Sequence, residues 1–134
     1  ADEDTEAVYR STEACGLPKG TEEEKAARSQ AIQDATLYAT KVPLETMKTA
    51  YAAFDICRAM AQEGNPASVS DAGVGALAAR SAVLGAWRTV RITAATLKDR
   101  ATADAILAEA KEMADIAQQQ EKEILAIVDT KIEG

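Results

Sequence analysis

The hydrophobic and polar positions of the chain repeat with the period of an α-helix over most of its length. Apolar residues recur every three or four positions in residues 21–41, 43–63 and 101–131, and charged residues occupy the positions between them. No segment alternates strictly between apolar and polar residues, as a half-buried β-strand would. The pattern therefore predicts an all-α protein.

Capping and helix-breaking residues predict where the first two helices lie. A helix over residues 1–15 is expected to end in the segment 16–20, GLPKG, because Pro18 cannot continue it. Thr21 and Glu24 have the spacing of a capping box, with Thr21 as the N-cap. A second helix is therefore predicted to begin directly after this loop.

Proline also predicts the next boundaries. The pair Val42 and Pro43 is expected to break the second helix, with Pro43 as the first residue of a third helix. That helix is expected to stop at the segment 64–66, GNP. With two further helices, the chain is predicted to form an antiparallel bundle of about five helices in a single domain, 1–134.

The fourth helix, over residues 68–93, is predicted to be the centre of this bundle. Ser68, Ser70 and Asp71 are expected to cap its start, and small residues fill most of the following turns. Each glycine inside a helix costs roughly 0.5–1 kcal/mol relative to alanine, so three glycines need an offsetting gain. Close approach of a neighbouring helix or of a flat ligand would supply it, which predicts a buried Gly/Ala-rich helix with a polar entrance.

The last helix carries an apolar seam whose steps alternate between four and three residues. This is the period of antiparallel bundle or coiled-coil packing, and Gln120 is its polar interruption. The seam is expected to serve core or dimer packing and no chemistry; its members are Ile106, Ala110, Met113, Ala117, Gln120, Ile124 and Ile127.

Composition narrows the function. A formal net charge of −7 disfavours binding to nucleic acid or to an anionic membrane, and no apolar run is long enough to span a bilayer. The chain has no histidine, which removes Ser-His-Asp and Cys-His catalysis as well as the Glu-x-x-His pairs of carboxylate-bridged metal bundles, so no metal site is expected. Cys15 and Cys57 lack metal-type spacing and are interpreted as reduced thiols of a cytoplasmic protein.

Three polar groups admit a structural and a functional interpretation. Asn65 and the segment 68–71 either cap the central helix or form a polar pocket in which Asp71 binds a heterocycle or moves a proton. Lys19 is either solvated or presents its ammonium group to an anion. The basic residues Arg80, Arg88 and Arg91 either form ion pairs with the many carboxylates or bind an anionic tail of a substrate.

Four segments, in order and spacing, resemble the cyclodeaminase/cyclohydrolase family. This family comprises the C-terminal domain of formiminotransferase-cyclodeaminase and bacterial methenyltetrahydrofolate cyclohydrolases. The segments are LPKGTEEEKAARSQAIQ at 17–33, VPLET at 42–46, GNPASVSDAGVGAL at 64–77 and GAWRTVRIT at 85–93. The resemblance implies that the chain is the C-terminal two-thirds of such a domain, which in the family begins with further helices.

The chain also departs from the family pattern. Thr89 and Thr93 stand where the family pattern resembles NVRIN, so two amides have become shorter hydroxyl side chains. Tyr9 occupies a position near Asp4 where the family tends to have an acidic or amide residue. These changes bear on substrate choice and on activity.

The resemblance implies an enzyme of folate one-carbon chemistry. It would hydrolyse methenyltetrahydrofolate to formyltetrahydrofolate, or cyclise formiminotetrahydrofolate with loss of ammonia. The reduced folate, with or without a polyglutamate tail, is the substrate, no cofactor is needed, and a homodimer is expected. Asp71 is expected to act as charge partner or base, and Lys19 as acid or as the group that stabilises the intermediate. Substrate binding is assigned to Asp4, Asn65, Ser70, Thr89 and Arg91.

A second hypothesis belongs to a different class. The long seam and the shortened N-terminus would also suit a non-catalytic helical oligomerisation or interaction domain related to the same family. Saturable binding of a reduced folate would distinguish the enzyme from such a module.

Overall fold

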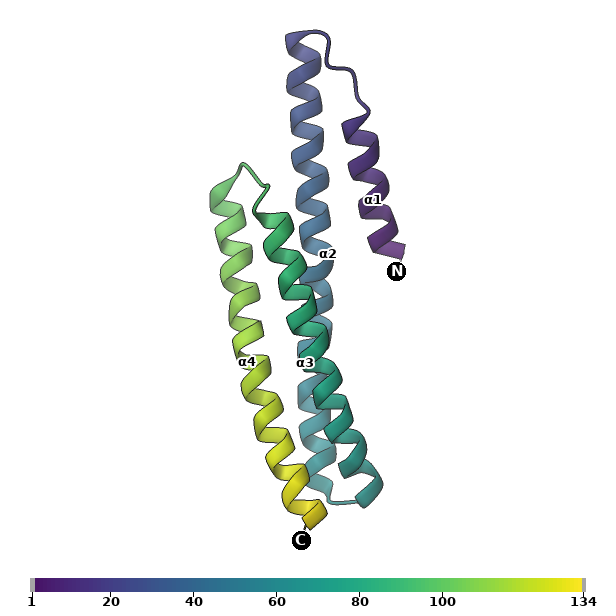
Figure 1. Cartoon of the computed structure of the whole chain (residues 1–134), viewed down its shortest axis with the longest axis vertical. Coiled ribbons are helices and arrows are strands. Elements are labelled where there is room, and N and C mark those ends of the chain that lie inside the picture. The colour runs from purple at the N-terminus through teal and green to yellow at the C-terminus, as the bar shows by residue number, and fades with distance from the viewer. Residues whose placement is uncertain (1, 134) are drawn as a thin grey trace.

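The computed structural model describes residues 2–133 and contains four α-helices within them: α1 (Asp2–Cys15), α2 (Glu22–Glu63), α3 (Pro66–Ala94) and α4 (Arg100–Glu133). Consecutive helices run antiparallel, and α1 lies along the upper half of α2, where it packs against α2 alone (Figure 1). The all-α prediction is confirmed. The prediction of about five helices is wrong for these residues, which form four.

The missing boundary is the one expected at Pro43, which lies inside the continuous helix α2. A proline in a helix interior costs about 3 kcal/mol because it removes one hydrogen bond and crowds the preceding turn. Three neighbouring side chains, Val42, Leu44 and Met47, are 0–7% exposed. Burial of such side chains is worth about 1.5–3 kcal/mol each, so packing on both sides of Pro43 outweighs the cost of the proline.

Helix α3 begins two residues earlier than expected, and its cap is a different residue. Asn65 is the N-cap, since its side-chain oxygen accepts a hydrogen bond of 3.0 Å from the backbone N–H of Ala67. The prediction that Ser68, Ser70 and Asp71 cap the helix is therefore wrong, because they lie inside its first two turns.

Helix α3 is also less enclosed than its small residues suggested. Its inner face packs against α2 and α4, and Ala72, Ala76 and Val83 are fully buried there. On the opposite face Val74 is 65% and Ile92 72% exposed. The expectation of a central helix buried all round is thus not met in the single chain, because no described helix covers its outer side.

Close approach explains two of the α3 glycines. A Cβ atom added at Gly75 would lie 2.8 Å from Sγ of Cys57 on α2, which is closer than packed atoms allow. One added at Gly73 would lie 3.3 Å from Val128 Cγ1 on α4. The small residues on the inner face therefore let three helices approach one another closely.

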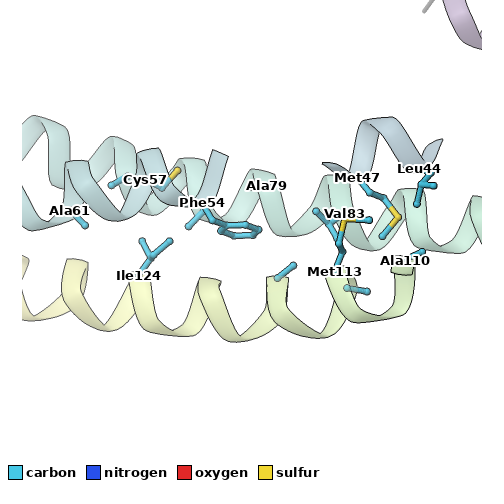
Figure 2. Close-up of a cluster of buried hydrophobic side chains, with 14 of the residues drawn as sticks. Leu44, Met47, Phe54, Cys57, Ala61, Ala79, Val83, Ala110, Met113 and Ile124 are labelled. Atoms are coloured by element: carbon cyan, nitrogen blue, oxygen red, sulfur yellow. The ribbon is translucent and has the colours of Figure 1, made fainter. Parts of the chain in front are cut away.

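Most of the core is an elongated cluster between α2, α3 and α4 (Figure 2), and Ala94, Leu97 and Ala103 form a second, smaller cluster. Phe54 is its largest buried side chain, and its ring meets that of Tyr51 edge to face with centroids 6.3 Å apart. The predicted seam of α4 is confirmed, because all its members are buried or partly buried. Gln120, its polar member, accepts a hydrogen bond from Arg58, which also pairs with Glu123 at 2.6 Å.

Candidate functional site

The predicted site residues fall into separate places along the bundle. Lys19 lies in the exposed loop before α2, and Asp71 lies just beyond the other end of that helix. The 42 residues of α2 span roughly 63 Å. A single chain therefore does not bring the two predicted catalytic residues together, as the positions of the two turns in Figure 1 make clear.

Three of the predicted residues gather at the turn between α2 and α3. Asn65 caps α3, and Ser70 and Asp71 are exposed on its second turn. Among residues 2–133 the Asp71 carboxylate takes part in none of the ion pairs. Asp71 is thus a solvent-facing carboxylate with no cation assigned to it within one chain.

Thr89 and Arg91 lie near the other end of α3. Both are exposed, and the Arg91 guanidinium stacks over the Trp87 ring at 4.9 Å from the ring centroid. Asp71 and Thr89 are eighteen positions apart, which is five helical turns, so they share one face of α3 about 27 Å apart. Arg91 lies about 30 Å from Asp71 along the axis.

Asp4 has a different environment on α1. It lines a cavity of about 290 Å³ together with Asp2, Glu3, Val42 and Thr46. Val42 and Thr46 are the first and last residues of the VPLET segment. The cavity therefore lies between the acidic start of α1 and one of the four segments on which the family resemblance was based.

A second cavity adjoins the first along α2. Glu3 and Thr46 line both, and Glu45, Thr49 and Ala50 complete the second one, whose volume is about 490 Å³. The two cavities form a groove with carboxylates on both sides, which suits a cationic group. Glu45 and Thr46 were not among the residues predicted to form the site, although the VPLET segment that contains them was the signal that could have pointed to them.

The three arginines of the basic group behave differently. Arg80 pairs with Glu121 of α4 at 3.0 Å, as the structural interpretation expected. Arg91 stacks on Trp87, and Arg88 donates only to the backbone carbonyl of Leu84 at 3.1 Å among the described contacts. Arg88 is therefore a cation of α3 with no carboxylate partner in residues 2–133.

The thiols offer no obvious nucleophile. Cys15 is exposed and Cys57 is buried, and both are free. Burial raises the pKa of the Cys57 thiol, which favours its protonated, less reactive form. In the described part of the chain, no three acidic, cysteine or histidine side chains cluster as metal ligands would, and no helix is long and apolar enough to cross a membrane.

Comparison with known proteins identifies relatives of the chain. A methenyltetrahydrofolate cyclohydrolase of Methylorubrum extorquens is 41% identical over 107 residues, which are 80% of this chain and 51% of the relative. A formimidoyltransferase-cyclodeaminase of Dictyostelium discoideum is 34% identical over 130 residues, 97% of this chain and 23% of the relative. That of Sus scrofa is 33% identical over 133 residues, 99% of this chain and 24% of the relative.

The chain spans about half the length of the cyclohydrolase and about a quarter of the two cyclodeaminases. The family model described as formiminotransferase-cyclodeaminase matches residues 1–112, and this stretch includes all four segments on which the resemblance was based. The chain therefore belongs to the formiminotransferase-cyclodeaminase family.

Proposed function

We propose that the chain acts on reduced folates, either hydrolysing methenyltetrahydrofolate to formyltetrahydrofolate or cyclising formiminotetrahydrofolate with release of ammonia. The observation that carries this proposal is the 41% identity to a methenyltetrahydrofolate cyclohydrolase over 80% of the chain.

The chemistry is an addition followed by an elimination. In the hydrolysis, water adds to the methenyl carbon, a proton leaves the added water, and one of the two C–N bonds breaks as its nitrogen takes up a proton. The formyl group remains on the other nitrogen. In the cyclisation, a folate nitrogen attacks the formimino carbon and ammonia leaves. Both reactions need a carboxylate near the cationic carbon and a group that carries the proton.

Side-chain chemistry suggests the roles. Asp71 is the charge partner or base, and Lys19 is the acid that stabilises the tetrahedral intermediate. Arg91 binds the carboxylates of the glutamate tail. Hydrogen bonds to the substrate come from Asp4, Asn65, Ser70 and Thr89. Lys19 and Asp71 of one chain are too far apart to act on one substrate molecule, so these two roles together require residues from more than one chain.

The remaining properties complete the proposal. The reaction as written uses no metal and no redox cofactor, so a tetrahydrofolate derivative is the only small molecule required. The protein is proposed to act in the cytoplasm, as a homodimer, without nucleic acid or membrane partners. An outer face of α3 that carries the exposed apolar residues Val74 and Ile92 supports the homodimer.

Substrate turnover by the full chain tests this proposal. The loss of methenyl-folate absorbance would be followed for the wild type and for Asp71→Asn, with formiminotetrahydrofolate as the second substrate. Loss of a general base lowers kcat by about 10²–10⁴-fold. Glu112→Gln is the matched control, because Glu112 is an exposed carboxylate of α4 that has no proposed role and forms no ion pair within residues 2–133. Unchanged turnover in Asp71→Asn would remove Asp71 from the mechanism.

A non-catalytic interaction domain is the second candidate function. It is favoured by the apolar residues on the outer face of α3, which a folate-free module would use to bind another protein surface. Calorimetric titration with a reduced folate separates the two, because an interaction domain would give no saturable heat.

A further inference from the structure

Two helix ends of the same sign meet at one end of the bundle. Helices α2 and α4 run in the same direction, so their C-termini lie together, beside the turn that joins α2 to α3 (Figure 1). Each helix C-terminus carries the equivalent of about half a negative charge, together with backbone carbonyls that have no partner inside the helix. A cation placed between the two ends therefore stabilises both.

Lys131 supplies a cation at this place. It is the basic residue of the last turn of α4, whereas the last turn of α2 has none. Its ammonium group donates a hydrogen bond of 3.3 Å to the backbone carbonyl of Gln62, one of the last carbonyls of α2. Within residues 2–133 Lys131 forms no ion pair with a carboxylate, so its charge acts on the helix end.

The side chain of Lys131 also packs on the turn itself. A Cβ atom added at Gly64 would lie 3.0 Å from Nζ of Lys131, 3.8 Å from Cδ and 3.9 Å from Cε. Gly64 has a φ of 80°, the left-handed conformation that favours glycine and that ends α2. Glycine at this position therefore allows both the sharp turn and the close approach of the lysine.

Packing between the turn and the end of α4 is incomplete. The turn consists of only two residues, Gly64 and Asn65, between the last residue of α2 and the first residue of α3. Beside it lies a cavity of about 260 Å³, which is lined by Gly64, Pro66, Val69, Lys131 and Ile132. Because this space is not filled by side chains, the turn depends more on its contact with Lys131 than a closely packed turn would.

The residue that follows Gly64 belongs to the proposed site. Asn65 is the N-cap of α3 and accepts a hydrogen bond of 3.0 Å from the N–H of Ala67, so the orientation of its side chain depends on the conformation of the turn. Ser70 and Asp71 follow on the second turn of the same helix. A side chain that holds Gly64 in place therefore also fixes the direction of Asn65.

We propose that Lys131 is a positioning residue, which holds the turn between α2 and α3 so that Asn65 meets the substrate in one orientation. This role rests on the proposed function, in which Asn65 binds the reduced folate. Lys131 lies outside residues 1–112, which the family model matches, and outside the four segments of the resemblance. Its assignment comes from its contacts with Gln62 and Gly64.

Amide exchange tests the positioning in the full chain without any folate. Lys131→Met keeps an unbranched side chain and removes its charge. Protection of the Ala67 N–H against exchange, measured by NMR, should fall about two- to fivefold, the size expected for one exposed cation at a helix C-terminus. Lys131→Arg keeps a charged donor and should retain the protection.

Two controls separate this effect from a general loosening of the chain. The Thr102 N–H forms the corresponding bond of 3.2 Å to Asp99 at the start of α4, about 45 Å from Lys131 along that helix, and its protection should not change. Lys122→Met removes another exposed lysine of α4 and should leave the Ala67 N–H as protected as in the wild type. Unchanged protection in Lys131→Met, or an equal loss at Thr102, would overturn the proposal.

Steady-state kinetics test whether this position matters to the substrate. A loosely held Asn65 weakens the binding of substrate and transition state alike, so Lys131→Met should raise KM about two- to fivefold and leave kcat unchanged. A merely structural role would reduce the amount of folded protein, which lowers kcat and leaves KM unchanged. Lys131→Arg and Lys122→Met should both have the wild-type KM. A lower kcat at unchanged KM in Lys131→Met would contradict the positioning role.

A double-mutant cycle tests whether Lys131 acts through Asn65. In an Asn65→Ala background the side chain to be positioned is absent, so Lys131→Met should add no further rise in KM. A full additional rise would show that the lysine acts by another route. If the wild-type chain turns over no reduced folate, the proposed function fails, while reduced protection of the Ala67 N–H would still show that Lys131 orders the turn. Unchanged protection overturns the inference even in an active enzyme.

Discussion

Gly75 and Gly85 lie on the same helix and differ only in what surrounds them. Gly75 faces α2, where an added Cβ would come within 2.8 Å of Cys57 Sγ, while Gly85 faces open space. The same contrast holds for the two faces of α3, since Val83 and Val90 are fully buried inside and Val74 and Ile92 are largely exposed outside. Small residues therefore occur on α3 in two different surroundings. On the inner face they allow a close contact with another helix, and on the outer face they border open space.

The two faces of α3 are expected to respond differently to substitution. The inner residues are accounted for by the packing of α2 and α4, so substitutions there change the stability of the single chain. The outer residues contribute little to that stability, so substitutions there are expected to leave it nearly unchanged or to raise it. The following measurements compare the two faces in order of decreasing expected effect.

Truncation of the largest core side chain has the largest expected effect. Phe54→Ala removes a ring that is 2% exposed and leaves a cavity between α2, α3 and α4. The expected loss in the free energy of unfolding is about 3–5 kcal/mol, measured by urea denaturation. Ile56→Ala on the same helix is the control, because Ile56 is 64% exposed and its truncation should cost less than about 0.5 kcal/mol.

Overpacking the inner face is expected to have a smaller effect. Gly75→Ala forces its new methyl group against Cys57 Sγ and should destabilise the chain by about 1–3 kcal/mol. Cys57→Ala removes the sulfur atom, so Gly75→Ala introduced into that variant should cost far less. Equal costs in both backgrounds would show that the contact with Cys57 does not determine the need for glycine.

The outer glycine should respond with the opposite sign. Gly85→Ala adds a methyl group that meets nothing in the single chain and restores helix propensity. The variant should be more stable by about 0.5–1 kcal/mol in dilute protein, measured by the same denaturation. Destabilisation of the dilute chain by this substitution would mean that Gly85 has a close neighbour after all.

Much of the fold could be predicted from the sequence, because the helices are amphipathic and their caps are local. Thr21 is the N-cap of α2 as its capping-box spacing predicted, with its hydroxyl accepting from the Glu24 N–H at 3.1 Å. The helix break predicted at Pro43 was wrong. The local propensity of proline favours a break, whereas burial of the side chains around it favours a continuous helix. No local signal reports that burial.

The candidate site was harder to predict. The joint role of Lys19 and Asp71 was inferred from residue type and from the resemblance, whereas the continuous α2 holds the two residues at opposite ends of the single chain. The clustering of Asn65, Ser70 and Asp71 was predictable because these residues are neighbours in sequence. The cavity that Asp4 shares with Thr46 was not, because it depends on how α1 lies along α2.

Acidification should slightly lower the stability of the fold through one carboxylate at the edge of the core. The hydrogen bond from Gln119, followed by the contact with Arg58, lowers the pKa of the Glu123 carboxyl below its ordinary value of about 4.3. A lowered folded-state pKa means that this stabilisation is complete above the unfolded-state value and is lost as the pH falls through the folded-state value. Stability should therefore decrease on acidification.

Glu123→Gln isolates this contribution, because it removes the titrating group and keeps the shape of the side chain. The urea midpoint of the variant should fall less than that of the wild type between about pH 6 and about pH 3. Glu112→Gln on the exposed side of α4 is the control, since no ion pair within residues 2–133 involves Glu112. If both variants retained the full wild-type pH dependence, the ion pair at the edge of the core would contribute no more to the pH dependence of stability than a solvated surface carboxylate does.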